Sequence, residues 1–550
     1  MGYKQWLTSL MLLVCFSVSK AQLPTFLFPL DTLPLLSGNF GEFRGSHFHA
    51  GIDIKTFGQT GLPVHATADG YVSRIKISPF GYGKAIYLTH HNGYTSVYGH
   101  LSSFNHELEK YVEEQQYHKK SYSIELFPGK NQFQVKQGDI IAFSGNSGGS
   151  YAPHLHFELR DTRTQEILDP LAFSLPVTDT LKPVLEKVQM VLRDREAKKN
   201  FGYYPVLGSG PSNEPIHLLP GEYAFILAAK DLMTADTSNI LGVYSVSIME
   251  GSEPLYTRET KRFSFSDSRY IHLLSAYEDG LAPLELCFKE PWQEIELANY
   301  YHDGWIFLEA GQTREITIVL RDEYGNQNTY KFVLYGDASF KAPKFVSDYN
   351  EEWLMGEVYK DEFSVGFERN TVLVDFFKNA LADTMRLYGH IINGQIDTLE
   401  LLPQSTYVAD RFRLIFTLPE MRKELKSKAC IIRNDGILNE YIGGSISGSQ
   451  ISGYSRNLGK FYLGFDTIAP TISEPEIRND SLFIQIEDDF SGISSYYPTI
   501  DGKWYLMEYD PKTGILFGHL ANFSGENKLE LKLIVKDHKD NLTTLSKTLE

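Results

Sequence analysis

The sequence predicts a mainly β protein: an antiparallel β-sheet domain near the N-terminus, followed by a series of β-sandwich modules. Short runs rich in β-branched and aromatic residues, such as 85–89 and 140–143, lie between glycine-rich turns at 81–83 and 145–149. This region has no long helical periodicity. Later segments open with a proline and continue with alternating apolar residues, which is typical of sandwich strands. A length of 550 residues allows about three to five such domains.

Residues 1–21 have the pattern of a secretory signal peptide. Lys4 supplies the positive start, residues 7–18 form an apolar run, and Ser19-Lys20-Ala21 permits cleavage before Gln22. The run is too short to span a bilayer, and no later apolar run is long enough. We therefore expect an exported protein of the periplasm or cell envelope, or a secreted one, with no membrane span in the mature chain.

Charge and cysteine content exclude some functions. The formal net charge is −17, which argues against broad nucleic-acid binding. After the signal peptide the chain has two cysteines, Cys287 and Cys430, which fall in different predicted domains. We expect buried free thiols at both positions and no disulfide between them.

Histidine is concentrated in one part of the chain. Of the 16 histidines, ten lie between His47 and His156. In an extended strand, side chains at even offsets share a face, so His154 and His156 can point the same way, as can His49 and Asp53. Two imidazole nitrogens and one carboxylate are a common ligand set for catalytic zinc, with a fourth position open to water.

The order of these motifs resembles the lysostaphin/LytM-type zinc metallopeptidases, bacterial enzymes that cut the peptide bridges of peptidoglycan. The resemblance rests on Asn-Phe-Gly-Glu-Phe-Arg at 39–44, then His-x-x-x-Asp, Gly-His-Leu and His-Leu-His. It covers roughly residues 38–173, and we place a LytM-like metallopeptidase domain at 38–175. No motif position is substituted.

The resemblance also implies a role for each site residue. The zinc ligands would be His49, Asp53 and His156, and the catalytic residues that orient water and move its proton would be His100 and His154. Arg44 matches a family arginine that could meet a substrate carboxylate or brace a loop. For four further histidines of the cluster we expect structural or surface positions; these are His47, His65, His90 and His91.

The segment 103–137 is longer than a tight hairpin needs. Helical spacing predicts a short helix over 107–116, and the residues that follow suggest a hairpin between 121–127 and 132–135. This segment could form one side of the substrate cleft or be a neutral surface insertion. The sequence does not decide between these two roles.

After residue 175 a crude repeat appears. Residues 179–183 and 466–470 share Asp-Thr-x-x-Pro. Residues 319–326 and 535–541 share a strand followed by an Asp and a turn with Gly or Asn. These features resemble bacterial immunoglobulin-like modules.

We place an immunoglobulin-like module at 178–337, with a possible insertion around 250–300. A β-rich module follows at 338–465 and a last immunoglobulin-like module at 466–550. The acidic turn at 487–492 lacks the ligand spacing of an EF-hand loop, and we expect a solvated turn there.

These observations together predict an exported, zinc-dependent endopeptidase whose partner is the peptide part of peptidoglycan. One alternative is a catalytically silent adaptor or wall-binding protein that keeps the fold and regulates other hydrolases. Another is a zinc peptidase acting on a different exported polypeptide. The C-terminal modules are expected to serve as interaction or spacer modules, with possible protein partners, and the competing interpretation is that one of them gates the cleft.

Overall fold

The computed structural model describes most of the chain from residue 23 to residue 549. The description leaves out Ser46 and the following ranges: 195–198, 208–213, 235–238, 277–281, 290–296, 341–351, 353, 359–361, 368–370, 379, 381–384, 394–396, 403–407, 409, 435–438 and 521–527. The predicted signal peptide, 1–21, also lies outside the described residues.

The N-terminal region is built on one large antiparallel sheet. Its strands lie in the order β1 (Leu36–Gly38), β4 (Ile52–Lys55), β13 (His154–Asp161), β8 (Tyr94–Leu101), β7 (Lys84–His90), β6 (Gly70–Ile77) and β10 (Ile124–Leu126). The shorter strands β11 (Gln134–Val135), β14 (Ile167–Leu168) and β22 (Arg262–Phe263) extend it. A second sheet contains β5 (Pro63–His65), β12 (Ile140–Phe143) and β9 (Ser103–Phe104), and a small hairpin joins β2 (Phe43–Arg44) to β3 (His47–Phe48). A 3₁₀ turn, η1 (Pro170–Phe173), follows β14.

The helix predicted at 107–116 is present as α1 (His106–Lys119). Asn105 caps its first turn by accepting a hydrogen bond from the Leu108 amide. The predicted hairpin after it is wrong, because β10 and β11 do not pair with each other. Both pair instead with β6, so the segment folds back along one strand of the main sheet.

Residues 184–336 form two further sheets that face each other across an apolar core. One sheet contains β16 (Lys199–Leu207), β15 (Val184–Asp194), β18 (Gly221–Leu232), β24 (Leu284–Leu286), β23 (Ser275–Ala276), β19 (Ile240–Leu241) and β26 (Ile306–Leu308). The other contains β17 (Ile216–Leu218), β28 (Gln327–Gly336), β27 (Thr313–Arg321), β20 (Ser245–Glu250), β21 (Glu253–Glu259) and β25 (Asn299–Tyr300). Short helical turns lie at η2 (Asp267–Tyr270), α2 (Ile271–Leu274) and η3 (His302–Gly304).

Two more pairs of sheets follow, each with its own core. In the first pair, one sheet contains β29 (Leu354–Val358), β32 (Met385–Ile392), β33 (Thr398–Leu402), β39 (Gly459–Phe465), β35 (Ala429–Asn434) and β36 (Asn439–Gly443). The other sheet contains β30 (Phe363–Phe367), β31 (Val372–Phe376), β34 (Phe412–Thr417), β38 (Gln450–Ser455) and β37 (Ser445–Ser447). The helix α3 (Lys423–Ser427) belongs to the same region. In the second pair, one sheet contains β40 (Thr471–Ile472), β42 (Ser481–Glu487), β41 (Glu476–Arg478), β46 (Ile515–His519) and β45 (Glu508–Asp510). The other sheet contains β44 (Lys503–Trp504), β43 (Ile493–Ile500), β47 (Leu529–Asp537) and β48 (Leu542–Leu549).

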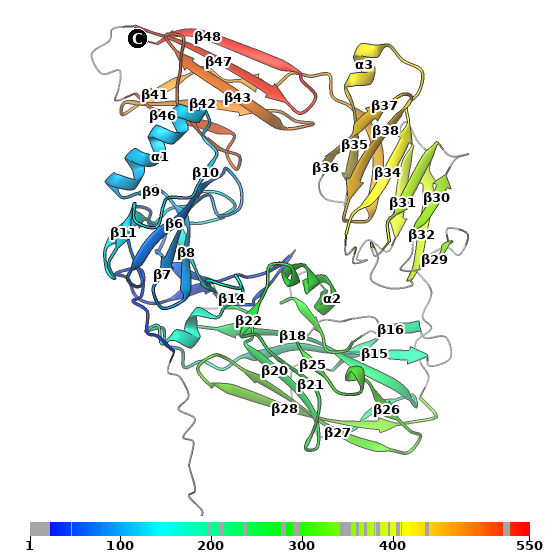
Figure 1. Cartoon of the computed structure of the whole chain (residues 1–550). Helices are drawn as coiled ribbons and strands as arrows, with labels where there is room; N and C mark the ends of the chain where they lie inside the picture. The colour runs from blue at the N-terminus through cyan, green and yellow to red at the C-terminus, as the bar shows by residue number, and fades with distance from the viewer. Residues whose placement is uncertain are drawn as a thin grey trace, which may run out of the picture.

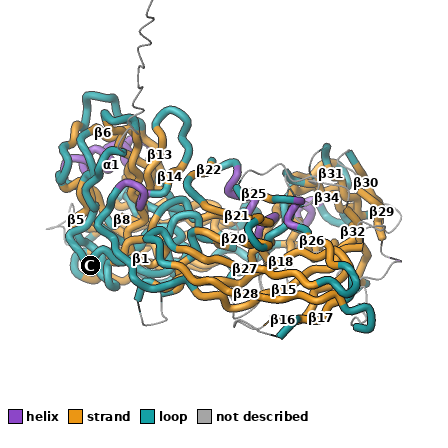
Figure 2. Tube along the Cα trace, turned by 90° about the horizontal axis from the view of Figure 1, so that it is seen from below, coloured by secondary structure: helices purple, strands orange, loops and turns teal. Residues whose placement is uncertain are grey.

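The predicted mainly β, antiparallel fold class is confirmed, and Figure 2 shows how few helical segments interrupt the strands. Among the strand pairs of the described residues only β17 with β28 is parallel. The description of the C-terminal sheets as immunoglobulin-like stays a prediction, as do the domain boundaries. Cys287 and Cys430 are buried and free, as expected. Within the described part of the chain, no helix is long and apolar enough to cross a membrane.

The N-terminal region shares its core with residues beyond 178. Phe263 stacks on Phe40, with ring centroids 5.1 Å apart, and lies against Phe48 at 5.6 Å. Strand β22, which contains Phe263, pairs with β14 and so joins the N-terminal sheet. This apolar contact anchors the second region of the chain to the first.

The last region of the chain, residues 471–549, contacts the N-terminal region. In Figure 1, β42 and β46 lie beside α1. The ring of Tyr117 on α1 meets the ring of Trp504 edge-on at 5.2 Å, and Lys84 forms an ion pair of 2.7 Å with Glu508. The N-terminal region is therefore held from two sides by later parts of its own chain.

We expect Phe263→Ala to lower the free energy of unfolding by about 3–5 kcal/mol, because it removes a buried ring and leaves a cavity. Thermal and denaturant unfolding would measure the change. Phe80→Ala is the matched control, since Phe80 is 65% exposed and its loss should change stability little. Equal stability of the two variants would contradict a shared core.

Candidate metal centre

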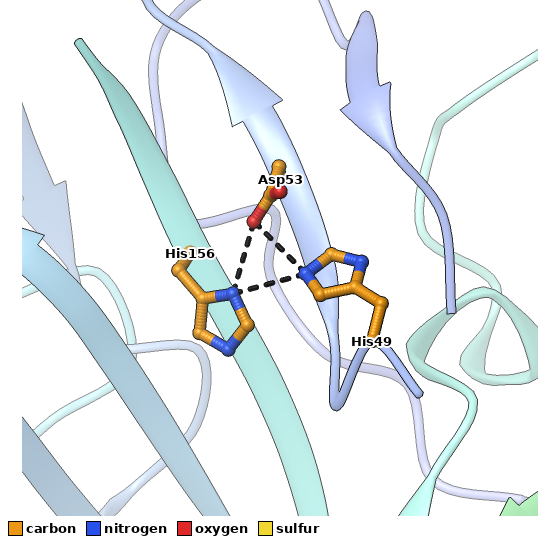
Figure 3. Close-up of side chains that lie close together, drawn as sticks. All are labelled: His49, Asp53 and His156. Carbon is orange, nitrogen blue, oxygen red and sulfur yellow. Dashed lines mark hydrogen bonds and ion pairs between the residues drawn. The ribbon is translucent and has the colours of Figure 1, made fainter. Parts of the chain in front are cut away.

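Three side chains converge on one point of the main sheet. Asp53 lies on β4 and His156 is its direct partner on the neighbouring strand β13, while His49 comes from the turn before β4. All three are buried. Figure 3 shows the two imidazole rings and the carboxylate turned toward each other.

The atoms that face each other are Nε2 of His49, Nδ1 of His156 and Oδ1 of Asp53. The two nitrogens are 3.1 Å apart, and Oδ1 of Asp53 lies 3.0 Å from the His49 nitrogen and 2.9 Å from the His156 nitrogen. A tetrahedral zinc ion with bonds of about 2.0–2.2 Å separates its ligand atoms by about 3.3–3.6 Å. Movements of a few tenths of an ångström would give that spacing, so the three groups fit the ion.

Outer hydrogen bonds give each imidazole the tautomer that a metal requires. The Nδ1 atom of His49 lies 2.7 Å from the Asn39 carbonyl, which can only accept, so this nitrogen donates and Nε2 keeps its lone pair. Nε2 of His156 lies 2.9 Å from a carboxylate oxygen of Glu158, which leaves Nδ1 free to act as a ligand. Such outer partners orient metal-binding histidines and raise their basicity.

The charge states also suit a cation. Burial lowers the pKa of His49 to about 4, so that ring is neutral near pH 7. Burial would raise the pKa of Asp53, but the three histidines around it hold that pKa well below its usual range. Burial opposes the charged form of His156 as well, yet Asp53 and Glu158 raise its pKa to about 9. A metal ion and a proton therefore compete for Nδ1 of His156.

Glu158 is itself fixed by a buried cation. Its Oε2 accepts a hydrogen bond of 2.7 Å from Nε of Arg160, and its Oε1 accepts one from the Tyr82 hydroxyl. Burial would raise the pKa of Glu158, but Arg160 and His156 lower it to about 2. The Tyr82 ring stacks on His156, with centroids 5.0 Å apart. These contacts hold the His156 ring in one plane.

The support for His49 comes from a different region of the chain. The side-chain amide of Asn39 donates to the Gly242 carbonyl at 2.7 Å and to Glu323 at 3.0 Å, and it accepts from the Gly242 amide. The Asn39 carbonyl that fixes His49 is thus held by residues more than 200 positions away. The region after residue 178 contributes directly to the geometry of the site.

Arg44 braces the ligand carboxylate. Its Nη2 donates to Oδ2 of Asp53 at 2.6 Å, leaving Oδ1 to face the two histidines. A side chain at Gly38 would not fit here, because an added Cβ would lie 2.5 Å from Nη2 of Arg44 and 2.9 Å from Oδ2 of Asp53. The contact that the structure shows is with the carboxylate of Asp53, and the two roles considered from the sequence, meeting a substrate carboxylate or bracing a loop, stay predictions.

His100 and His154 lie next to the three converging groups. Their rings are 4.8 Å apart, and Nε2 of His154 lies 3.3 Å from Oδ1 of Asp53. The carbonyls of Ser147 and Ala152 lie 2.9 and 2.8 Å from Nδ1 of His100 and His154, respectively. Each Nδ1 therefore donates, and each Nε2 keeps a lone pair. Burial, with the charges of His156 and His154, lowers the pKa of His100 to about 3.

His100 has a left-handed backbone conformation, with φ of 59°. A non-glycine residue in this region is uncommon and costs about 1–3 kcal/mol, and such strain concentrates at functional sites. The surrounding hydrogen bonds hold it there, including the His100 amide to the Tyr82 carbonyl at 2.8 Å.

The four clustered histidines that were given no role, His47, His65, His90 and His91, occupy structural or surface positions, as expected. His90 is buried and bonds to the Asp69 carbonyl and to Ser96, whereas His65 bonds to the Gly138 carbonyl and Asp31. His47 and His91 are exposed. Sequence reasoning gave no role to Asn39, Glu158 or Glu323. Glu158 could have been found, because it shares the face of β13 with the histidine pair.

Comparison with known proteins identifies this region. Residues 47–118 match the model of Peptidase family M23. The chain contains an M23 peptidase domain. The matched segment includes His49, Asp53 and His100, and ends before His154 and His156. The resemblance to lysostaphin/LytM-type peptidases is confirmed, whereas the comparisons do not test the immunoglobulin-like modules.

Several curated proteins are similar over this region. An uncharacterized metalloprotease of Haemophilus influenzae is 33% identical over 151 residues, which is 28% of this chain and 26% of that protein. The DD-carboxypeptidase/endopeptidase Mpg of Neisseria meningitidis is 31% identical over 131 residues, 24% of each chain. Lysostaphin of Staphylococcus simulans is 30% identical over 128 residues, 23% of this chain and 21% of that one. The chain thus spans about a quarter of the length of these relatives.

Among solved structures, the catalytic domain of lysostaphin from Staphylococcus simulans is 28% identical. The match covers 24% of this chain and 87% of that domain, with a TM-score of 0.19.

We expect the purified chain to bind one zinc ion at His49, Asp53 and His156. His49→Ala should lose the metal while the fold survives, because His49 lies before β4 of a sheet with an extensive core. Elemental analysis and circular dichroism would measure the two properties. His91→Ala, at an exposed histidine, is the matched control and should keep one zinc ion. Equal zinc content in His49→Ala and wild type would overturn the assignment.

Proposed function

We propose that this chain is an exported, zinc-dependent endopeptidase that hydrolyses the peptide cross-links of bacterial peptidoglycan. The single observation that supports it most is the convergence of His49, Asp53 and His156, with two more histidines beside them. The similarity to Mpg, named as a DD-carboxypeptidase/endopeptidase, and to lysostaphin supports peptide cross-links as the substrate class.

Zinc held by three protein ligands supplies Lewis acidity and lowers the pKa of a water to about 7. In this proposal the chain's own residues do the rest. His154 accepts the proton of the attacking water at Nε2, because its Nδ1 is already committed to the Ala152 carbonyl. His100, whose Nε2 also keeps a lone pair, helps to orient the water. His154, once it carries the proton of the water, stabilises the developing oxyanion and then gives that proton to the leaving amine. Asp53, braced by Arg44, keeps a negative charge beside the ion.

The loop at 144–153 sets the orientation of both proton-transfer histidines, since it contains Ser147 and Ala152. Lys512, from the last region of the chain, donates to two carbonyls of the same loop, Asn146 at 2.5 Å and Ser150 at 3.2 Å. We therefore infer that the last region braces the catalytic loop, a more specific role than the spacer expected from the sequence.

We expect His154→Ala and His100→Ala to keep zinc and to lose about 10²–10⁴-fold in hydrolysis rate, the usual contribution of a positioned proton-transfer group. His118→Ala, at an exposed position on α1, is the control. If His154→Ala loses zinc and His156→Ala retains it, the roles of the pair are reversed.

The assay is digestion of purified peptidoglycan by the full chain with zinc, followed by mass analysis of the released fragments. Cross-linked peptides should be cut, and a chelator should stop the reaction. Tight binding to peptidoglycan with no release of fragments would favour the catalytically silent adaptor. Cleavage of an exported polypeptide with no cleavage of peptidoglycan would favour the other alternative.

We expect Lys512→Ala to lower kcat by about tenfold and to leave zinc content unchanged, because the loop loses two charge-assisted hydrogen bonds and not a ligand. Lys503→Ala, at an exposed position on β44, is the matched control. A several-fold rise in activity on small peptides would instead show that the last region restricts access to the site.

A further inference from the structure

Two groups of three aspartates lie away from the metal centre, one in each of two regions of the chain. In each group one carboxylate oxygen from every member lies within 4.8 Å of the others. The first group is Asp179, Asp231 and Asp322; the second is Asp466, Asp488 and Asp537.

The two groups occupy equivalent places in two similar pairs of sheets. The first aspartate precedes an opening strand, Asp179 before β15 and Asp466 before β40. The second lies at the end of the strand that pairs with it, which is β18 in one region and β42 in the other. The third ends the first strand of the β27–β28 or β47–β48 hairpin. The repeat at 179–183 thus lies beside the late turn at 322–326, and the repeat at 466–470 lies beside the late turn at 537–541.

The late turns are built in the same way. Asp322 accepts from the Tyr324 and Asn326 amides, and Asp537 accepts from the Lys539 and Asn541 amides. The asparagine side chain in each turn also donates to the carbonyl of the first aspartate, at 3.1 Å in one region and 3.0 Å in the other. These hydrogen bonds explain why the Asp and Asn of the late turns recur in both regions. They do not balance the negative charge of the three carboxylates in each group.

The observation that points to a ligand is a carboxylate oxygen without a partner in each group. Oδ1 of Asp231 and Oδ2 of Asp466 have no hydrogen bond, and both residues are only 1% exposed. Among the described residues, no lysine, arginine or histidine forms an ion pair with any of the six aspartates. Lys539 is near enough for its charge to act on Asp466 without forming an ion pair. Buried carboxylates are costly unless they are paired or bind a metal.

We propose that each group of three aspartates binds one hard divalent cation, Ca²⁺ in preference to Mg²⁺. Ca²⁺ takes six to eight oxygen ligands at about 2.3–2.6 Å, so opposite oxygens lie up to about 5 Å apart. In each group the three carboxylate oxygens lie within 4.8 Å of one another, which is close enough for one such cation to contact all three. An all-oxygen set does not favour zinc, which prefers nitrogen and sulfur ligands.

Two properties of the groups support this assignment. Two of the three members are buried in each group. Burial raises the pKa of Asp231 to about 7, and the charges of Asp179 and Asp322 contribute in the same direction, which is the cost a cation would remove. The sequence suggested only a solvated turn at 487–492. In this proposal the turn instead supplies a cation ligand, because Asp488 is one of the three members of the second group.

The first site would also bear on the metal centre. Glu323 follows Asp322 directly and holds Asn39, whose carbonyl fixes His49. A cation at Asp322 would stiffen the turn from which Glu323 reaches Asn39. The second site lies in the region that supplies Lys512.

Equilibrium dialysis of the full chain against Ca²⁺, after removal of metals, tests the proposal. Wild type should bind two Ca²⁺ ions, with a dissociation constant on the order of 10⁻⁴–10⁻³ M, which is typical of extracellular modules. Asp231→Asn and Asp488→Asn should each bind one ion, and the double variant none. Asp303→Asn and Asp489→Asn change exposed aspartates in the same regions and should leave two.

A thermal melt separates binding from simple loss of fold. Without added cation, Asp231→Asn should melt no lower than wild type, because it removes an unpaired buried charge. With Ca²⁺, wild type should melt at a higher temperature while the double variant should not change. Mg²⁺ should fill the same two sites more weakly, since it requires near-octahedral geometry.

The same measurements in the His49→Ala variant keep this result independent of the zinc centre and of the proposed peptidase activity. Wild type that binds no Ca²⁺, or a double variant that still binds two ions, would overturn the proposal.

Discussion

The buried carboxylate of Asp53 is the contact on which the rest of the site depends. One oxygen faces His49, His156 and His154, and the other receives Arg44. A buried charge of this kind is tolerable only when it is surrounded by donors or cations. Arg44 is the donor to Asp53, and a cation held by His49, His156 and Asp53 would balance the rest of its charge. The antiparallel register of β4, β13 and β8 brings Asp53, His154, His156 and His100 together in one sheet.

Every imidazole in the site has its orientation set by an outer hydrogen bond. Carbonyls of Asn39, Ser147 and Ala152 accept from three of the rings, and Glu158 accepts from the fourth. The result is a set of lone pairs that face one region of the sheet. Metal affinity and proton transfer both depend on such partners, which contribute without touching the reacting atoms.

Those outer partners connect the site to distant parts of the chain. Gly242 and Glu323 hold Asn39, and Lys512 holds the loop that contains Ser147 and Ala152. Two later regions of the chain contact the N-terminal region. Phe263 lies in the shared core on one side, and Glu508 forms an ion pair with Lys84 on the other. The later regions therefore support the geometry of the site, whatever else they bind.

The sequence by itself determined the mainly β fold class, the helix at α1 and the free cysteines, and it predicted the candidate site residues that the structure brings together. Strand alternation is a local property, visible within a few residues of His49 or His156, whereas the role of each site residue came from the resemblance of the motif order to a known family. Only the tertiary structure decided that β10 and β11 pair with β6, that Asn39 depends on Glu323, and that Asp231 joins Asp179 and Asp322. These contacts join residues far apart in the chain, and their partners are set by how sheets pack and not by any local pattern.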